Sequence, residues 1–93
     1  MPCCRCRSKM NSSLSKRERG HIGRVKELPC SVCGKPGPSQ AHHIEQGLHY
    51  TVVALCLECH QGDNGWHGTK ALWRVAKMDE LKALNVTLSR LRA

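Results

Sequence analysis

Two short cysteine motifs decide what this chain can fold into: Cys30-Ser31-Val32-Cys33 and, after 22 intervening residues, Cys56-Leu57-Glu58-Cys59. A two-residue gap lets both sulfurs of one turn reach a single ion about 2.3 Å away. Four thiolates complete the tetrahedral coordination of Zn²⁺, so we predict a structural zinc ion held by Cys30, Cys33, Cys56 and Cys59. The gap between the motifs slightly exceeds common zinc-ribbon spacing, which is expected if a β-hairpin is inserted. The alternative is four buried thiols that are free or partly oxidised.

The rest of the composition favours such a cross-link. The 93 residues are 40% hydrophobic but only 3% aromatic, with no Phe. A chain of this length buries only about 60–65% of its unfolded surface, so many such domains need an additional staple. No apolar run approaches the roughly 18–20 residues that span a bilayer, and the N-terminus lacks the apolar stretch of a secretory signal. We therefore expect no membrane association and a cytoplasmic location, where paired cysteines are metal ligands before they are disulfides.

The chain divides into a leader and one domain. Residues 1–14 lack hydrophobic periodicity and are expected to form a flexible, basic, cysteine-rich leader, while residues 15–93 form the zinc-stabilised domain. Cys3, Cys4 and Cys6 of the leader have no evident fourth ligand. We expect them to be exposed thiols; a second zinc that borrows His21 is the alternative.

Periodicity predicts a small α+β fold. Residues 15–28 carry Ile22, Val25 and Leu28 at helical spacing, with Ser15 as the expected N-cap, and Pro29 ends this helix. Residues 40–44 and 51–55 are expected to be the two strands of a hairpin. A short helix is expected from residue 56 to about 61, interrupted by glycines.

Two more helical segments are predicted towards the C-terminus. Residues 70–77 are expected to form one or two turns that bury Leu72, Trp73 and Ala76. The last helix is predicted to start near an Asp79 cap and to carry an amphipathic leucine stripe. The stripe is most simply core packing; a dimer through this C-terminal helix is the sharper alternative. Its members are Leu81, Leu84, Leu88 and Leu91.

Positive charge is concentrated at one end of the chain. The net charge is +8, and residues 1–28 hold eight basic and two acidic side chains. Such a concentration indicates a polyanionic partner, most simply nucleic acid, although a solvated tail is the alternative. The predicted nucleic-acid contacts on the first helix are Lys16, Arg17, Arg19, Arg24 and Lys26.

Histidines surround the cysteine framework. His42 and His43 lie between the motifs, His60 directly follows the second motif, and His67 follows seven residues later. Adjacent residues on a strand point to opposite faces, so one of His42 and His43 could ligate a metal while the other addresses substrate. His49, in the loop beside Tyr50, is expected to be an ordinary exposed residue.

These pieces resemble a known superfamily, the HNH (ββα-metal) nucleases in their zinc-stabilised form. The matching segments are Cys30-Ser31-Val32-Cys33, Ala41-His42-His43-Ile44 and residues 54–60. Within it, the run from Glu18 to Val25 and the segment Trp66-His67-Gly68 look like the phage and prophage Ref-type group of RecA-dependent recombination-enhancement nucleases. The resemblance covers about residues 15–92. It implies a ββα-metal core with flanking N- and C-terminal helices.

The resemblance also implies an activity, a metal-dependent DNA endonuclease of phage or prophage origin in the bacterial host cytoplasm. His43 would be the general base that activates water, because a neutral imidazole suits that role near pH 7. His42, His60 and His67 would hold the catalytic cation, Mg²⁺ or Mn²⁺ or else Zn²⁺. The products would carry 5′-phosphate and 3′-hydroxyl ends, and cleavage would be targeted to, or dependent on, RecA filaments.

Two positions depart from the family pattern. The orienting Asn falls near Thr51, which can still hydrogen-bond but lacks an amide. The final metal ligand often lies four residues beyond the Cys-His histidine, where this chain has Asn64. Asn64 is therefore the alternative ligand to His67, which reaches the ion only if the helix breaks at the glycines. The second functional hypothesis is a non-catalytic zinc module that binds nucleic acid or docks a protein.

Overall fold

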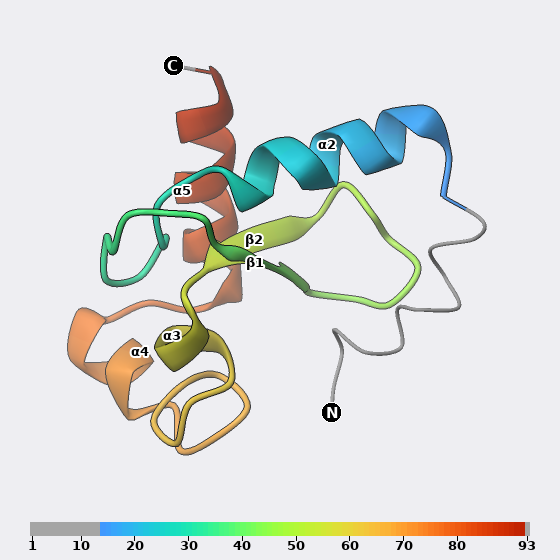
Figure 1. Cartoon of the computed structure of the whole chain (residues 1–93). Coiled ribbons are helices and arrows are strands. Elements are labelled where there is room, and N and C mark those ends of the chain that lie inside the picture. The colour runs from blue at the N-terminus through green and yellow to red at the C-terminus, as the bar shows by residue number, and fades with distance from the viewer. Residues whose placement is uncertain (1–13, 93) are drawn as a thin grey trace.

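A two-stranded antiparallel sheet lies at the centre of the fold, with helices packed around it (Figure 1). The computed structural model describes residues 14–92, so the prediction for Cys3, Cys4 and Cys6 lies outside the described residues. No helix in this part of the chain is long and apolar enough to cross a membrane. The elements are α2 (Lys16–Lys26), β1 (Gln40–His43), β2 (Val52–Leu55), α3 (Leu57–His60), α4 (Ala71–Ala76) and α5 (Glu80–Arg92). This confirms the small α+β class.

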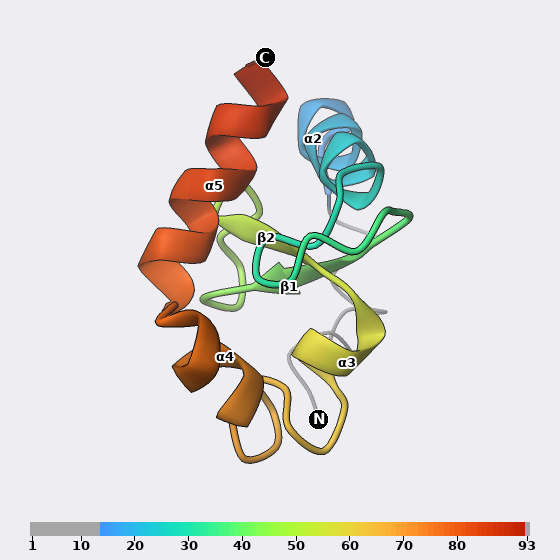
Figure 2. The same cartoon turned by 90° about the vertical axis from the view of Figure 1, so that its left-hand side faces the viewer.

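Helices cover the hairpin from several directions (Figure 2). Helix α2 packs across both strands, and α5 packs along β2. Helices α3 and α4 lie together at the opposite end of the molecule from α2 (Figure 1). The strands pair in the register His42 with Val53 and His43 with Val52, so the adjacent histidines are held on a regular ladder.

Helix α2 begins where the sequence predicts, because Ser15 caps it. The Ser15 hydroxyl accepts from the Glu18 backbone N–H at 3.1 Å, and the Glu18 carboxylate accepts from the Ser15 backbone N–H at 2.8 Å. This capping box satisfies two N–H groups that the first turn would leave unpaired. The same Ser15 N–H lowers the pKa of Glu18. Val25 then anchors the helix in the core against Val52 and Ala54.

The outer edge of β2 is closed by polar groups rather than by a third strand. The Ser31 backbone N–H donates to the Ala54 carbonyl at 2.9 Å, and the Ala54 N–H donates to the Thr87 hydroxyl at 3.3 Å. Ser31 Oγ and Thr87 Oγ1 lie 2.7 Å apart and hydrogen-bond each other. These bonds give partners to strand groups that would otherwise be a template for aggregation.

The packing of α5 corrects the expected leucine stripe. Its buried residues are Ala83 and Thr87, which are four residues apart and small enough to bring the helix close to β2. Leu84 packs partly against the core, but Leu81 and Leu88 are 75% and 39% exposed. The prediction that the leucines form one core stripe is therefore wrong for Leu81 and Leu88.

The second correction concerns α4. Trp73 is buried as predicted, and its Nε1–H donates to the Cys59 carbonyl at 2.8 Å. Leu72 and Ala76 are exposed, against the prediction. The helix has only six residues and follows Lys70 in the left-handed region, so only the Trp73 side reaches the core.

Replacing Thr87 with Val should destabilise the protein by about 1–3 kcal/mol, because the isosteric change leaves the buried Ser31 hydroxyl and the Ala54 N–H without a partner. The measurement is the free energy of unfolding from urea titration. Ser89→Ala on the same helix, which removes an exposed hydroxyl, is the control and should change stability by less than about 0.5 kcal/mol. Equal effects of the two substitutions would contradict this role of Thr87.

Candidate metal centres

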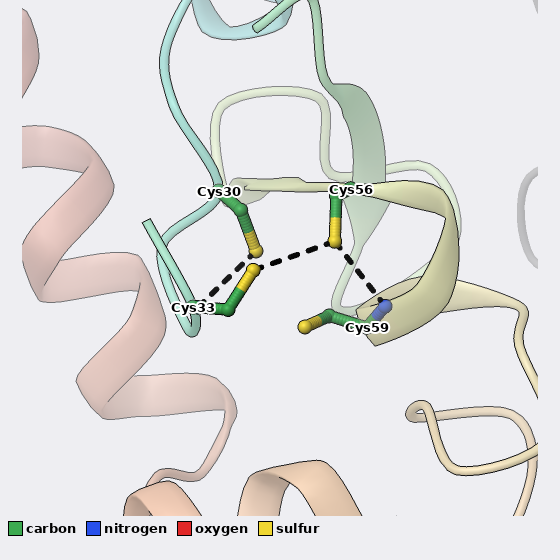
Figure 3. Close-up of side chains that lie close together, drawn as sticks. All are labelled: Cys30, Cys33, Cys56 and Cys59. Atoms are coloured by element: carbon green, nitrogen blue, oxygen red, sulfur yellow. Dashed lines mark hydrogen bonds between the residues drawn. The ribbon is translucent and has the colours of Figure 1, made fainter. Parts of the chain in front are cut away.

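The four cysteines of the two motifs converge on one point (Figure 3). Their sulfurs all lie within 4.8 Å of one another, and the sulfurs of Cys33 and Cys56 are 3.6 Å apart. Cys30, Cys56 and Cys59 are buried, whereas Cys33 is exposed. This arrangement could hold one metal ion such as zinc, as the spacing predicts.

Local backbone structure aims these sulfurs. The chain reverses at the first motif through Gly34, whose positive φ of 79° lets its N–H donate back to the Cys30 carbonyl at 3.0 Å. Cys56 is the N-cap residue of α3, and its sulfur accepts from the Cys59 N–H at 3.4 Å. Each motif is thus a tight turn with both thiols on one side.

The acidities of the thiols also fit a cation. Burial acts to raise the pKa of Cys30, but the backbone N–H groups of Cys33, Cys56 and Val32 outweigh it and lower the pKa to about 7. Burial raises the pKa of Cys59, and the nearby Cys30 charge raises it further. One thiolate therefore opposes the next, and a bound dication would relieve that repulsion.

A second cluster is formed by three histidines from separate parts of the chain. His42 comes from β1, His60 ends α3, and His67 lies in the loop after α3; each offers a ring nitrogen within 4.8 Å of the others. His42 Nδ1 and His60 Nε2 lie 3.3 Å apart. His42 and His60 are buried, whereas His67 is exposed. The cluster therefore has two enclosed ligands and one at the surface.

The loop after α3 is folded back so that His67 reaches this cluster. Helix α3 is only four residues long, and afterwards the Trp66 N–H donates to the Cys59 carbonyl at 2.8 Å. The His67 N–H donates to the His60 carbonyl at 3.1 Å. A Cβ at Gly65 would collide with the backbone of Glu58, so only glycine permits this return. The helix therefore ends at His60, and the returning loop brings His67 beside His42 and His60.

Two polar side chains that the sequence did not single out hold the buried imidazoles. Glu80 Oε2 lies 2.7 Å from His42 Nε2, and Gln40 Oε1 lies 2.7 Å from His60 Nδ1. Since the other nitrogen of each ring faces the cluster, these contacts fix the ring orientation and leave His42 Nδ1 and His60 Nε2 to act as ligands. No local spacing could reveal Glu80, which lies 38 residues from His42.

The donor set is selective for the kind of ion. Burial, with the neighbouring His42 and His67, lowers the pKa of His60 to about 3, so its imidazole is neutral at physiological pH. Neutral imidazoles suit Zn²⁺ and other transition metals, whereas Mg²⁺ prefers oxygen ligands. Within the expected set of cations, the three-histidine site therefore fits Zn²⁺ better than Mg²⁺.

His43 lies outside the three-histidine cluster and pairs with another histidine. His43 Nε2 and His49 Nδ1 are 3.2 Å apart, and the rings meet edge to face. His43 borders a cavity against α2, consistent with side chains alternating along β1. Burial, followed by the nearby His49, lowers the pKa of His43. The expectation that His49 is an ordinary exposed residue is wrong, since it is half-buried and contacts His43.

Thr51 and Asn64, the two predicted orienting residues, are not members of either cluster. The Thr51 hydroxyl donates to the Leu48 carbonyl at 3.4 Å, which ties the loop to itself. The exposed Asn64 accepts from the Thr69 hydroxyl at 3.0 Å, so its side-chain oxygen stabilises the loop. No protein-family model, curated protein or solved structure matches this chain.

Each protein molecule should hold two metal ions, and Glu80→Gln should weaken only the one bound by the histidines. Loss of a carboxylate behind a ligating imidazole typically costs about 10–100-fold in metal affinity. Isothermal titration with Zn²⁺ of protein already loaded at the cysteine site measures this. Glu45→Gln, an exposed carboxylate in the hairpin loop, is the control. One ion per chain in the unsubstituted protein would contradict the second site.

His60 should remain neutral at pH 5 in protein whose histidine site is empty. Since folding lowers its pKa from about 6.5 to about 3, the unfolded chain binds the extra proton, and the free energy of unfolding falls as pH falls through this window. The contribution is at most about 1.4 kcal/mol per pH unit. Imidazole ¹⁵N shifts report the protonation directly. His60→Asn should lose this part of the pH dependence, and a His60 midpoint near pH 6 would refute the assignment.

Proposed function

We propose that this protein is a metal-dependent DNA endonuclease of the HNH type. The observation that carries the proposal is the three-histidine cluster, which is separate from the cysteine site and has its own supporting Glu80 and Gln40. A domain already cross-linked by four thiolates has no structural need for three more ligands. The exposure of His67 leaves one side of this cluster open to solvent, as a catalytic metal site requires.

The residues of this chain divide the work of phosphodiester hydrolysis. A cation held by His42, His60 and His67 would supply Lewis-acid stabilisation of the developing negative charge. His43 accepts the proton of the attacking water, a role suited to an imidazole whose lowered pKa keeps it neutral near pH 7. His49 holds the His43 ring in one orientation through their 3.2 Å contact, which is the support that Thr51 does not give.

The partner in this proposal is DNA, met through the basic helix α2. Its basic side chains contact phosphates without reading the base sequence. The similarity to the Ref-type group extends the proposal to a phage or prophage origin, a bacterial cytoplasmic location and cleavage on RecA filaments. The proposal also takes the ion in the cysteine site to be structural zinc and the core to be a ββα-metal motif. The proposed phosphate contacts on α2 are Lys16, Arg17, Arg19, Arg24 and Lys26.

A second candidate function is a non-catalytic metal-bound module that docks on nucleic acid or protein. It is favoured by the position of His43, which pairs with His49 rather than joining the three-histidine cluster. In that case the histidine site would stiffen the loop that carries His67. The exposed Leu81 and Leu88 would then be available for a dimer through α5.

His43→Ala should abolish Mn²⁺- or Zn²⁺-dependent nicking of supercoiled plasmid, a loss of about 100-fold or more, because the general base is removed. The assay is run with and without RecA filaments. Metal content should stay unchanged, since His43 is not in the metal-binding cluster, and DNA binding should be retained, since the proposed phosphate contacts are on α2.

Leu48→Ala, an exposed change in the same hairpin, is the control and should nick at the normal rate. Normal nicking by His43→Ala would remove His43 from the role of base. Absence of nicking by the unsubstituted protein under all these conditions, together with intact metal sites, would favour the docking module.

A further inference from the structure

A cavity of about 650 Å³ lies between α2 and the first strand. The α2 residues that line it are Arg19, Ile22, Gly23 and Lys26, whose spacing of three, one and three residues places them on one helix face. The opposite wall includes His43 and Gln40 of β1. The cavity is therefore a groove with a helical wall on one side and a strand on the other.

The groove is lined by positive and neutral groups. Arg19 and Lys26 stand two helical turns apart, about 10 Å along the axis, and no carboxylate is among the described residues that line the cavity. Arg19 uses one N–H for the Leu14 carbonyl, which fixes the side chain and leaves other guanidinium donors. Successive phosphates of one strand are separated by about 3.4 Å measured along the axis of a duplex, so two cations about 10 Å apart suit non-adjacent phosphates of one strand.

The groove leads to the metal centre through Gln40. This side chain lines the cavity and also contacts His60 Nδ1 at 2.7 Å. Gln61, the residue after His60, lines the same cavity. A strand bound along the groove would therefore pass His43 and end beside the three-histidine cluster.

The other basic residues of α2 are placed differently. Arg17 and Arg24 are exposed and do not line the groove, and they too are seven residues apart. The Arg24 guanidinium reaches back towards Gly20, which also lies outside the groove lining. Besides Lys16, which also does not line the groove, the helix thus carries two matched pairs of cations, of which one faces the groove.

We propose that this groove seats the sugar–phosphate backbone of a DNA strand, with Arg19 and Lys26 as the phosphate contacts and Arg17 and Arg24 outside the bound strand. The proposal rests on the nuclease function in assigning DNA as the ligand. It restricts the contacts of α2 from five basic residues to two. Gly23 provides the open wall against which the backbone lies, because a Cβ there would meet no atom within 4 Å.

The test compares two doubly substituted proteins that lose the same charge from the same helix, Arg19→Gln/Lys26→Gln and Arg17→Gln/Arg24→Gln. Fluorescence anisotropy with a labelled 20-nucleotide single-stranded DNA, without added divalent cation, measures binding and its salt dependence. The groove pair should weaken binding by about tenfold or more and reduce the salt slope by about 1.4, the value for two phosphate contacts on a single strand. The outer pair should change affinity by less than about threefold.

A second comparison leaves charge unchanged. Gly23→Leu fills the groove, whereas Gly20→Leu adds the same side chain outside it, and both replace a helical glycine with a better helix former. Gly23→Leu should weaken DNA binding about tenfold and Gly20→Leu should not. Circular dichroism should show both variants folded.

Equal losses from the two charge pairs, or normal binding by Gly23→Leu, would overturn the groove proposal. A competition experiment tests the class of partner. If poly-glutamate displaces labelled DNA as effectively as an unlabelled oligonucleotide of equal charge does, the groove proposal is overturned in favour of an acidic protein partner. Failure of the nuclease function is distinguishable, because it appears in the nicking assay. A protein that never nicks DNA but shows the groove-specific binding loss would retain this proposal.

Discussion

The convergence of four sulfurs is the constraint on which the rest of this structure depends. It joins the turn that follows α2 to the first turn of α3, and the 22 residues between the motifs must leave and return to the same point. An antiparallel hairpin satisfies that requirement, since its two strands begin and end side by side. The opposed thiol pKa values show why the cluster suits a cation: burial raises that of Cys59, while the N–H donors around Cys30 favour a thiolate there.

The same connection positions the second cluster. Because His60 directly follows Cys59, fixing the second motif also fixes one imidazole, and His42 of β1 lies with its Nδ1 3.3 Å from His60 Nε2. The backbone carbonyls of Cys59 and His60 then accept from Trp66 and His67, so the end of the short helix itself holds the returning loop. One cluster offers four cysteine sulfurs, of which only that of Cys33 belongs to an exposed residue. The other offers three imidazoles, of which only that of His67 is exposed. Cys59 and His60, which are neighbours in α3, each contribute one side chain to one of these two clusters.

Local rules predicted the parts of the fold that local forces determine. The motif spacing predicted the sulfur cluster, Ser15 predicted the start of α2, and the glycines predicted the break that admits His67. The contacts of Glu80, Gln40 and His49 were missed because each joins residues brought together only by tertiary packing. The leucines of α5 misled for a related reason. Periodicity marks an apolar face, but close packing against β2 selected the small Ala83 and Thr87 instead.

The alternation of β1 explains how one strand could serve two purposes in the proposed enzyme. His42 belongs to the three-histidine cluster and contacts Glu80, whereas His43 borders the groove against α2. Consecutive Cα atoms are only about 3.8 Å apart, so the two faces are close although their side chains diverge. For His43 to activate water at a phosphate near the metal, that phosphate must lie within reach of both His43 and the three-histidine cluster. At the start of β1, Gln40 contacts His60 and also lines the groove, so the groove extends to the three-histidine cluster. A strand that followed the cationic face of α2 would meet the metal centre at this end.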